Sequence, residues 1–390
     1  MNSANSKDYN IYLYNFKPIF TKITLFEEKL SRLEQIRYIE NPHEFYKETA
    51  YNKEVDGKLS YFYLFSQIKL KKDEKISRYL THSIDFYKGN FQAQMVRGLI
   101  NYCNLDKKST ILDIFCGSGT TLVESKLLGY HAIGIDINPI ACLNSKIKTE
   151  LLDTPVELLL SCNNKYLEIS YYNKKRFDYE NFNSFLKLPI RDLFYIFIFT
   201  RSLSDERYVF KDRTRAFFEN YEKIILLLKR FENLKKTIEY RSIRSDIIHG
   251  DVVLRLTQIK TETIDAIITS PPYIDAINYI ENDIDQIKYL YANDQIDFLI
   301  KNSIGCKLQN IRLTEKEFWL RIEKVFIEVF RILKSESNFI LVVGFYRNMK
   351  DNFIRIAQKY NFQIERVLER EVISFKKKKT IEYVLFFKKP

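Results

Sequence analysis

The chain has 390 residues, of which 46% are hydrophobic, so it is long and apolar enough to bury a globular core. Its 62 Lys and Arg residues outnumber 50 Asp and Glu residues, which gives a formal charge of +12. This balance favours a polyanionic partner such as nucleic acid over an acidic small molecule, although an A+T-rich genome would enrich lysine as well.

The five cysteines contain no CxxC pair, and the four histidines do not cluster with them, so the sequence indicates no metal site. No apolar run approaches the roughly 20 residues that a membrane helix needs. No signal peptide is evident, and unpaired thiols are typical of a reducing compartment. We therefore expect a soluble, cytoplasmic protein with neither a metal nor a membrane partner.

The hydrophobic pattern divides the chain into four stretches. Residues 1–80 are polar and aromatic and form an N-terminal extension, within which residues 26–40 have the spacing of an amphipathic helix. Residues 81–150 and 246–390 alternate short apolar strands with helical segments, which predicts two parts of one α/β domain. Residues 151–245 are helical and aromatic, and they interrupt this alternation as an insertion.

Residues 109–139, STILDIFCGSGTTLVESKLLGYHAIGIDINP, predict a strand, a tight turn, a helix and a second strand. Asp113 lies near the carboxyl end of the first strand, and Gly117 and Gly119 allow the turn without a Cβ clash. The second strand ends at Asp136, 17 residues after Gly119. That spacing is close to the ~20 residues at which dinucleotide folds place a ribose-binding acid, so the unit predicts a nucleoside site.

The residues after the second glycine restrict the kind of nucleoside. A phosphate-binding P-loop requires Lys followed by Ser or Thr, whereas this chain has Thr120, Thr121 and Leu122. Leu122 also stands where the nicotinamide fingerprint has its third glycine. S-adenosylmethionine suits such a site, because its hydroxyl, sulfonium and ammonium groups favour Asp113 and Asp136, which would repel a phosphate.

The strings DIFCGSGTT and GIDINP resemble the cofactor motifs of amino-group DNA methyltransferases, which modify N4 of cytosine or N6 of adenine, and TSPPY at residues 269–273 resembles their catalytic motif. The resemblance covers roughly residues 83–140 and the chain from residue 247 onward. It implies an α/β fold, a Rossmann-like methyltransferase sheet with helices on both faces and an antiparallel last strand. It also implies S-adenosylmethionine as cofactor and double-stranded DNA as substrate. The cofactor-binding residues that it implies are Tyr87, Phe91, Asp113, Phe115, Cys116, Gly117, Gly119, Thr120, Asp136, Ile137 and Asp251.

Two of these positions have an alternative interpretation. Cys116 could be a small packing residue inside the glycine turn. Residues 247–253 predict a third strand that ends in Asp251, and this carboxylate could equally cap the next helix.

The prolines of the second motif follow a predicted strand at residues 264–268. Because proline fixes φ, Pro271 and Pro272 predict a rigid turn at the sheet edge where α/β proteins bind ligands. By resemblance, the Ser270 hydroxyl and the Pro271 carbonyl accept hydrogen bonds from the target amine, and Tyr273 stacks on a flipped base. The four catalytic residues are thus Ser270, Pro271, Pro272 and Tyr273.

The atom that receives the methyl group is constrained by two observations. A ring-carbon cytosine methyltransferase presents a nucleophilic cysteine after proline, and no Pro-Cys pair occurs in the chain. In the family pattern, Ser at the first motif position is associated with cytosine N4, and Asp or Asn with adenine N6. Cytosine N4 is therefore favoured, with adenine N6 as the alternative.

The motif order places the insertion between the cofactor and catalytic motifs, which by resemblance makes it the candidate target-recognition region. It carries 18 Lys and Arg against 13 Asp and Glu, with aromatic residues interleaved. A purely structural helical cap, an RNA substrate and a non-catalytic nucleic-acid-binding module remain as alternatives. A separately encoded restriction endonuclease is the expected partner.

Overall fold

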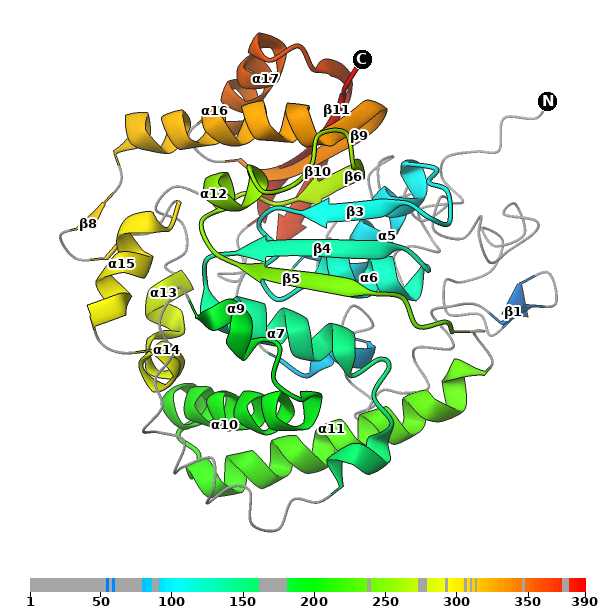
Figure 1. The fold of residues 1–390 in the computed structure, drawn as a ribbon, viewed down its shortest axis with the longest axis vertical. Helices are drawn as coiled ribbons and strands as arrows, with labels where there is room; N and C mark the ends of the chain where they lie inside the picture. Colours follow the sequence, from blue (N-terminus) through cyan, green and yellow to red (C-terminus); the bar gives the residue numbers. More distant parts are fainter. Residues whose placement is uncertain are drawn as a thin grey trace.

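The computed structural model describes residues 54–55, 58–59, 79–85, 91–160, 181–236, 240–272, 279–291, 294–304, 307–308, 311–312, 314–345, 348–373 and 379–390. The expected helix at residues 26–40 lies outside these ranges. Apart from two short ribbons, the described strands form one seven-stranded sheet in the order β10-β11-β9-β6-β3-β4-β5 (Figure 1). Its strands are β3 (Thr110–Asp113), β4 (His131–Asp136), β5 (Ser245–His249), β6 (Ile264–Thr269), β9 (Leu333–Gly344), β10 (Gln363–Ile373) and β11 (Lys379–Lys388).

The sheet is mixed in the way that the resemblance implied. Parallel pairs join β5, β4, β3, β6 and β9, whereas β11 runs antiparallel to both β9 and β10. The central strands β3, β4 and β6 are short and mostly apolar, as expected for strands that helices cover on both faces. The strand order reverses between β3 and β6, so the carboxyl ends of these two strands open a crevice.

Helices cover both faces of this sheet (Figure 1). One layer contains α12 (Val252–Leu256), α16 (Glu315–Ile332) and α17 (Met349–Lys359), which pack with β3, β6 and β9 in one apolar cluster. The other contains α5 (Ala93–Tyr102), α6 (Thr120–Leu127) and α7 (Pro139–Glu150).

The insertion forms a further helical layer outside α7. It comprises η3 (Val156–Leu159), α9 (Phe182–Phe185), α10 (Ile190–Val209) and α11 (Arg213–Lys235). One apolar cluster joins these helices to α7 and to α13 (Tyr279–Asn282), α14 (Ile284–Leu290) and α15 (Asp294–Asn302). The insertion is therefore continuous with the core of the catalytic part.

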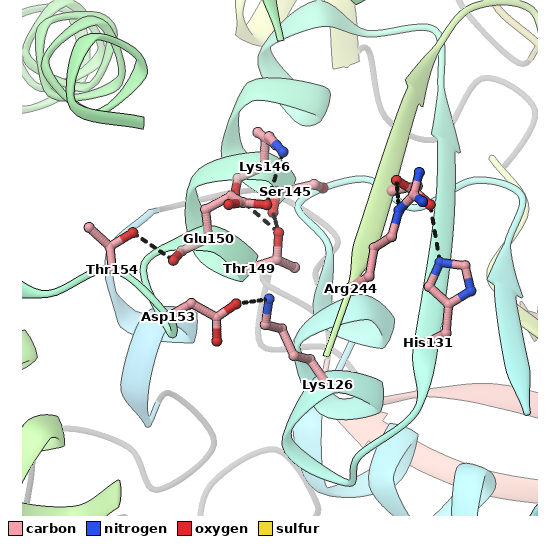
Figure 2. Close-up of polar contacts among 10 residues, drawn as sticks. Lys126, His131, Ser145, Lys146, Thr149, Glu150, Asp153, Thr154 and Arg244 are labelled. Carbon is pink, nitrogen blue, oxygen red and sulfur yellow. Dashed lines mark hydrogen bonds and ion pairs between the residues drawn. The ribbon is translucent and has the colours of Figure 1, made fainter. Parts of the chain in front are cut away.

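Smaller elements complete the described chain. They are η2 (Leu80–Ser83) and the two-stranded ribbons β1 (Glu54–Val55) with β2 (Lys58–Leu59) and β7 (Lys307–Leu308) with β8 (Ile311–Arg312). At the edge of the main sheet formed by β5, His131 of β4 contacts the Asp246 carboxylate of β5 at 3.1 Å. Arg244 contacts the same carboxylate (Figure 2). No helix within the described ranges is both long and apolar enough to cross a membrane.

One expected strand boundary is wrong. The third strand, expected to reach Asp251, ends at His249. Gly250 follows with φ of +150°, and the Asp251 side chain then accepts from the Leu254 amide at 3.2 Å as the N-cap of α12. The helix-capping alternative for Asp251 is thus confirmed.

Candidate active site

Asp113 is the last residue of β3 and is buried below the crevice. Its Oδ1 accepts from the Phe115 amide at 3.2 Å and from the Thr269 hydroxyl at 2.6 Å. Burial raises the pKa of Asp113 to about 6, although hydrogen bonds from Thr121, Thr269 and Phe115 act in the opposite direction. The Thr269 contact directly joins the end of the first motif strand to the residue before Ser270.

The glycine turn connects β3 to α6 through left-handed backbone. Gly117 has φ of +50°, and Gly119, the N-cap of α6, has φ of +79°. A Cβ at Gly119 would lie 2.9 Å from the Ser145 Cα, so both the backbone conformation and the close approach of α7 require glycine. Ser145 also donates to the Gly117 carbonyl at 2.7 Å, which fixes the turn against α7.

Asp136 ends β4 beside this turn. Its Oδ2 accepts from the Gly117 amide and its Oδ1 from the Asn138 amide, each at 2.8 Å. Burial raises the pKa of Asp136 to about 6, while these backbone donors lower it. The carboxylate therefore holds the glycine turn as well as facing the crevice.

The Ser-Pro-Pro turn leaves β6 at the same edge of the sheet. β6 pairs with β3 on one side and with β9 on the other, where Thr269 lies opposite Leu341. The Ser270 hydroxyl donates to the Val342 carbonyl at 3.0 Å. Because this bond uses the single hydroxyl hydrogen, the Ser270 oxygen keeps its lone pairs for accepting a hydrogen bond.

The two turns line one pocket of about 890 Å³, including its open mouth. Nine of the expected cofactor residues line it, namely Phe91, Asp113, Phe115, Cys116, Gly117, Thr120, Asp136, Ile137 and Asp251. From the catalytic motif, Ser270 and Pro272 line it. Gly119 and Pro271 are not among the lining residues, and Tyr87 and Tyr273 lie outside the described part of the chain.

Sequence reasoning missed nine further lining residues. They are Ile114, Ser118, Asn138, Gly250, Val252, Ile280, Asn302, Ser303 and Ile304. Several adjoin expected positions and could have been found from the motif strings, but Asn302, Ser303 and Ile304 come from the end of α15 and the residues after it. Arg321 of α16 donates to the Asn302 carbonyl at 2.8 Å, so a tertiary contact places this segment over the pocket.

The chemistry of the lining suits a nucleoside that carries cationic groups. Its titratable residues include three carboxylates, Asp113, Asp136 and Asp251, and no Lys or Arg belongs to the described lining. Carboxylates accept hydrogen bonds from ribose hydroxyls and attract sulfonium and ammonium groups, whereas they repel phosphate. No group of three or more His, Cys, Asp or Glu in the described ranges could hold a metal ion.

The strand order, the antiparallel β11 and the crevice at the strand ends define a Rossmann-like methyltransferase fold. A family model described as DNA methylase, covering N6- and N4-directed enzymes, matches residues 1–146. Together with the curated relatives below, this match makes the chain similar to amino-group DNA methyltransferases, whose methyl donor is S-adenosylmethionine.

Two curated relatives carry Type II methyltransferase names. M.BsoBI of Geobacillus stearothermophilus is 25% identical over 285 residues, which cover 57% of this chain and 55% of that protein. M.MjaII of Methanocaldococcus jannaschii is 25% identical over 416 residues, which cover 75% of this chain and 77% of that protein. The matched part thus spans about half of the first relative and about three quarters of the second.

Among solved structures, a SAM-dependent methyltransferase from Methanosarcina mazei is similar with a TM-score of 0.36 and 12% identity. The match covers 75% of this chain and 96% of that one.

Proposed function

We propose that the protein transfers a methyl group from S-adenosylmethionine to an exocyclic amine of double-stranded DNA, with N4 of cytosine as the favoured target. The observation that carries this proposal is the shared pocket, where the glycine turn and the Ser270 turn meet across the bond between Thr269 and Asp113. Bound in this pocket, S-adenosylmethionine supplies an electrophilic methyl group on a sulfonium.

The protein must orient the amine, because its lone pair is delocalised into the base ring. We assign the Ser270 hydroxyl oxygen and the Pro271 carbonyl as acceptors for its two N–H bonds, which aims the lone pair at the methyl group. The hydrogen bond from Ser270 to the Val342 carbonyl supports this role, because it turns the hydroxyl oxygen into an acceptor. We assign Tyr273 to stacking on the flipped base.

The preference for cytosine rests on the residue type at the first motif position. Serine presents a neutral hydroxyl, and the family pattern associates it with cytosine N4, whereas Asp or Asn accompanies adenine N6. The Type II names of the two relatives support a setting in which a separately encoded restriction endonuclease is the partner.

The insertion at residues 151–245 is our candidate for target recognition. The turn between α10 and α11 lies on the side of the molecule toward which β3 and β4 point (Figure 1). That side is also where the pocket opens at the strand ends, so DNA bound there could contact both regions. Residues 81–150 and 246–390 then form the catalytic domain.

Nucleoside analysis tests the proposal directly. The purified protein is incubated with S-adenosylmethionine and either double-stranded DNA or transfer RNA, and the digested nucleosides are identified by mass spectrometry. We expect N4-methylcytosine in DNA. N6-methyladenine would show that the target is adenine, and methylated RNA would show that the substrate is RNA. If calorimetry detects no binding of S-adenosylmethionine, the non-catalytic alternative is favoured.

Substitution of the catalytic turn tests the assigned residues. We expect Ser270→Ala to lower kcat by about 100-fold, the usual scale for a lost oriented hydrogen-bond group, with cofactor affinity retained. Transfer that survives in a Ser270→Ala, Tyr273→Ala double variant would show that the chemistry lies elsewhere.

A further inference from the structure

A buried lysine lies directly behind the glycine turn. Lys148, in the last turn of α7, donates to the Ser118 hydroxyl oxygen at 3.2 Å and to Asp85 Oδ1 at 3.1 Å. The exposed fractions are 0% for Lys148, 3% for Ser118 and 4% for Asp85. A lysine is almost never so completely buried, and an ammonium group there costs desolvation energy that its contacts must offset.

One of these three residues belongs to the pocket wall. Ser118 lies in the glycine turn and lines the pocket. Asp85 precedes Phe91, another lining residue, by six positions along the chain. The Lys148 ammonium is therefore one side chain away from the pocket at the glycine turn.

This cation matters because of the charge of the lining. Three aspartates and no described Lys or Arg line the pocket, yet the amino-acid end of S-adenosylmethionine carries a carboxylate beside its ammonium. A carboxylate among aspartates needs a compensating donor. Arg321 reaches the lining only through a backbone carbonyl, that of Asn302, whereas Lys148 contacts the hydroxyl of a lining side chain.

We propose that Lys148, acting through Ser118, is the positioning residue for the carboxylate of the cofactor. The ammonium donates to the Ser118 hydroxyl oxygen and places the positive end of its ion pair with Asp85 at this part of the wall. Asp85 balances the buried charge and ties the upstream segment to it. This inference rests on the proposed function, because it requires S-adenosylmethionine in the pocket.

The test compares two ligands that differ only in the carboxylate. Calorimetry measures the affinity of the full chain for S-adenosylmethionine and for decarboxylated S-adenosylmethionine, which keeps the amine. We expect Lys148→Met to weaken S-adenosylmethionine about tenfold or more, the scale of a lost charge-assisted hydrogen bond. Binding of the decarboxylated ligand should change less than about twofold. An equal loss for both ligands, or no loss, would overturn the proposal.

Lys146→Met is the matched control. Lys146 lies on the same helix, but its side chain is 23% exposed and pairs with Glu150 at 2.9 Å (Figure 2). This variant should bind both ligands as the unchanged protein does. A loss restricted to the carboxylated ligand in this control would also overturn the assignment to Lys148.

Ser118→Ala keeps the inference testable if Lys148→Met does not fold. It removes one hydroxyl and leaves the ion pair between Lys148 and Asp85 in place. We expect a smaller loss of affinity that is again confined to S-adenosylmethionine. If the Ser118→Ala variant binds both ligands as tightly as the unchanged protein does, Ser118 does not have the proposed role. If the unchanged protein binds neither ligand, the proposed function fails as well, so the two failures are distinguishable.

Discussion

Asp136 links the cofactor pocket to pH. Burial raises its pKa to about 6, well above the ordinary value of an aspartate, while its backbone donors hold it in place. A ligand with hydroxyl and cationic groups binds the ionised carboxylate better than the neutral acid. Binding therefore favours loss of the proton, and affinity should fall as the pH drops through about 6.

Below that pH the carboxyl of the free protein is protonated, so each binding event must release one proton. If one carboxyl controls binding, we expect the dissociation constant for S-adenosylmethionine to rise about tenfold per pH unit. Asp113, whose pKa is also raised to about 6, would steepen this response. Calorimetry between pH 5 and pH 8 checks the slope. Asp136→Asn should bind weakly with a shallower pH dependence, and an unchanged slope in this variant would assign the titration to another group.

At this scale the sequence predicts residues that belong to short strings and misses those that tertiary packing brings in. Asp113 and Asp136 are predictable because they lie at strand ends and at a recognisable spacing from the glycines. Asn302 lines the pocket from the end of α15, where Arg321 of α16 donates to its carbonyl, and no local pattern encodes that contact.

At the scale of elements, a buried polar cluster holds α5 and α6 together with residues 79–83. Glu124 of α6 accepts from the Tyr79 hydroxyl and contacts His82, each at 2.7 Å, and its other oxygen lies 2.6 Å from Arg97 of α5. Burial alone would raise the pKa of Glu124, but Arg97 and the hydrogen bonds outweigh it and keep the pKa below its usual value. The carboxylate is thus charged and compensated within the core.

Arg97→Leu should therefore lower the free energy of unfolding by about 3–5 kcal/mol, because it leaves a buried carboxylate without its cation. Chemical denaturation measures this change. The double variant Arg97→Leu, Glu124→Leu should recover part of the loss, since both charges are then removed. Arg215→Ala, which breaks an exposed pair with Glu219, is the control and should change the free energy of unfolding little. Equal losses at both sites would contradict a structural role for the buried cluster.

Elements whose apolar residues recur at regular spacing were predictable from the sequence, and elements that mix polar and apolar residues were not. Residues 217–236 predict the helix seen as α11, and the terminal hairpin of β10 and β11 follows from its apolar pattern. The apolar run at residues 339–343 predicts a buried strand, and β9, which contains this run, begins earlier, at Leu333. Its first half, with Lys334, Ser335 and Glu336, is polar and exposed. These three residues fall in an irregularity of the ladder with β6, between the pairs Leu333–Ile264 and Asn338–Ala266.

At the scale of the molecule, the insertion contributes to the hydrophobic core and is also our candidate for recognition of the DNA target. Phe194 and Phe197 of α10 and Leu228 of α11 are buried in the same cluster as Leu143 and Ile147 of α7. Helices that contribute this much apolar surface cannot be removed without exposing the core. Recognition must therefore be tested through binding of the whole chain.

The net charge of +12 gives such a test. If double-stranded DNA is the substrate, binding releases counterions, and the logarithm of the association constant should fall linearly with the logarithm of salt concentration, by about 0.9 per phosphate neutralised. Fluorescence anisotropy with a labelled duplex between about 50 and 200 mM salt measures this slope. Binding of S-adenosylmethionine, measured by calorimetry in the same buffers, should change little because the pocket contacts are short-ranged and partly buried. A DNA affinity that is independent of salt would mean that the basic residues do not contact phosphates, and the surplus of lysine would then reflect genome composition.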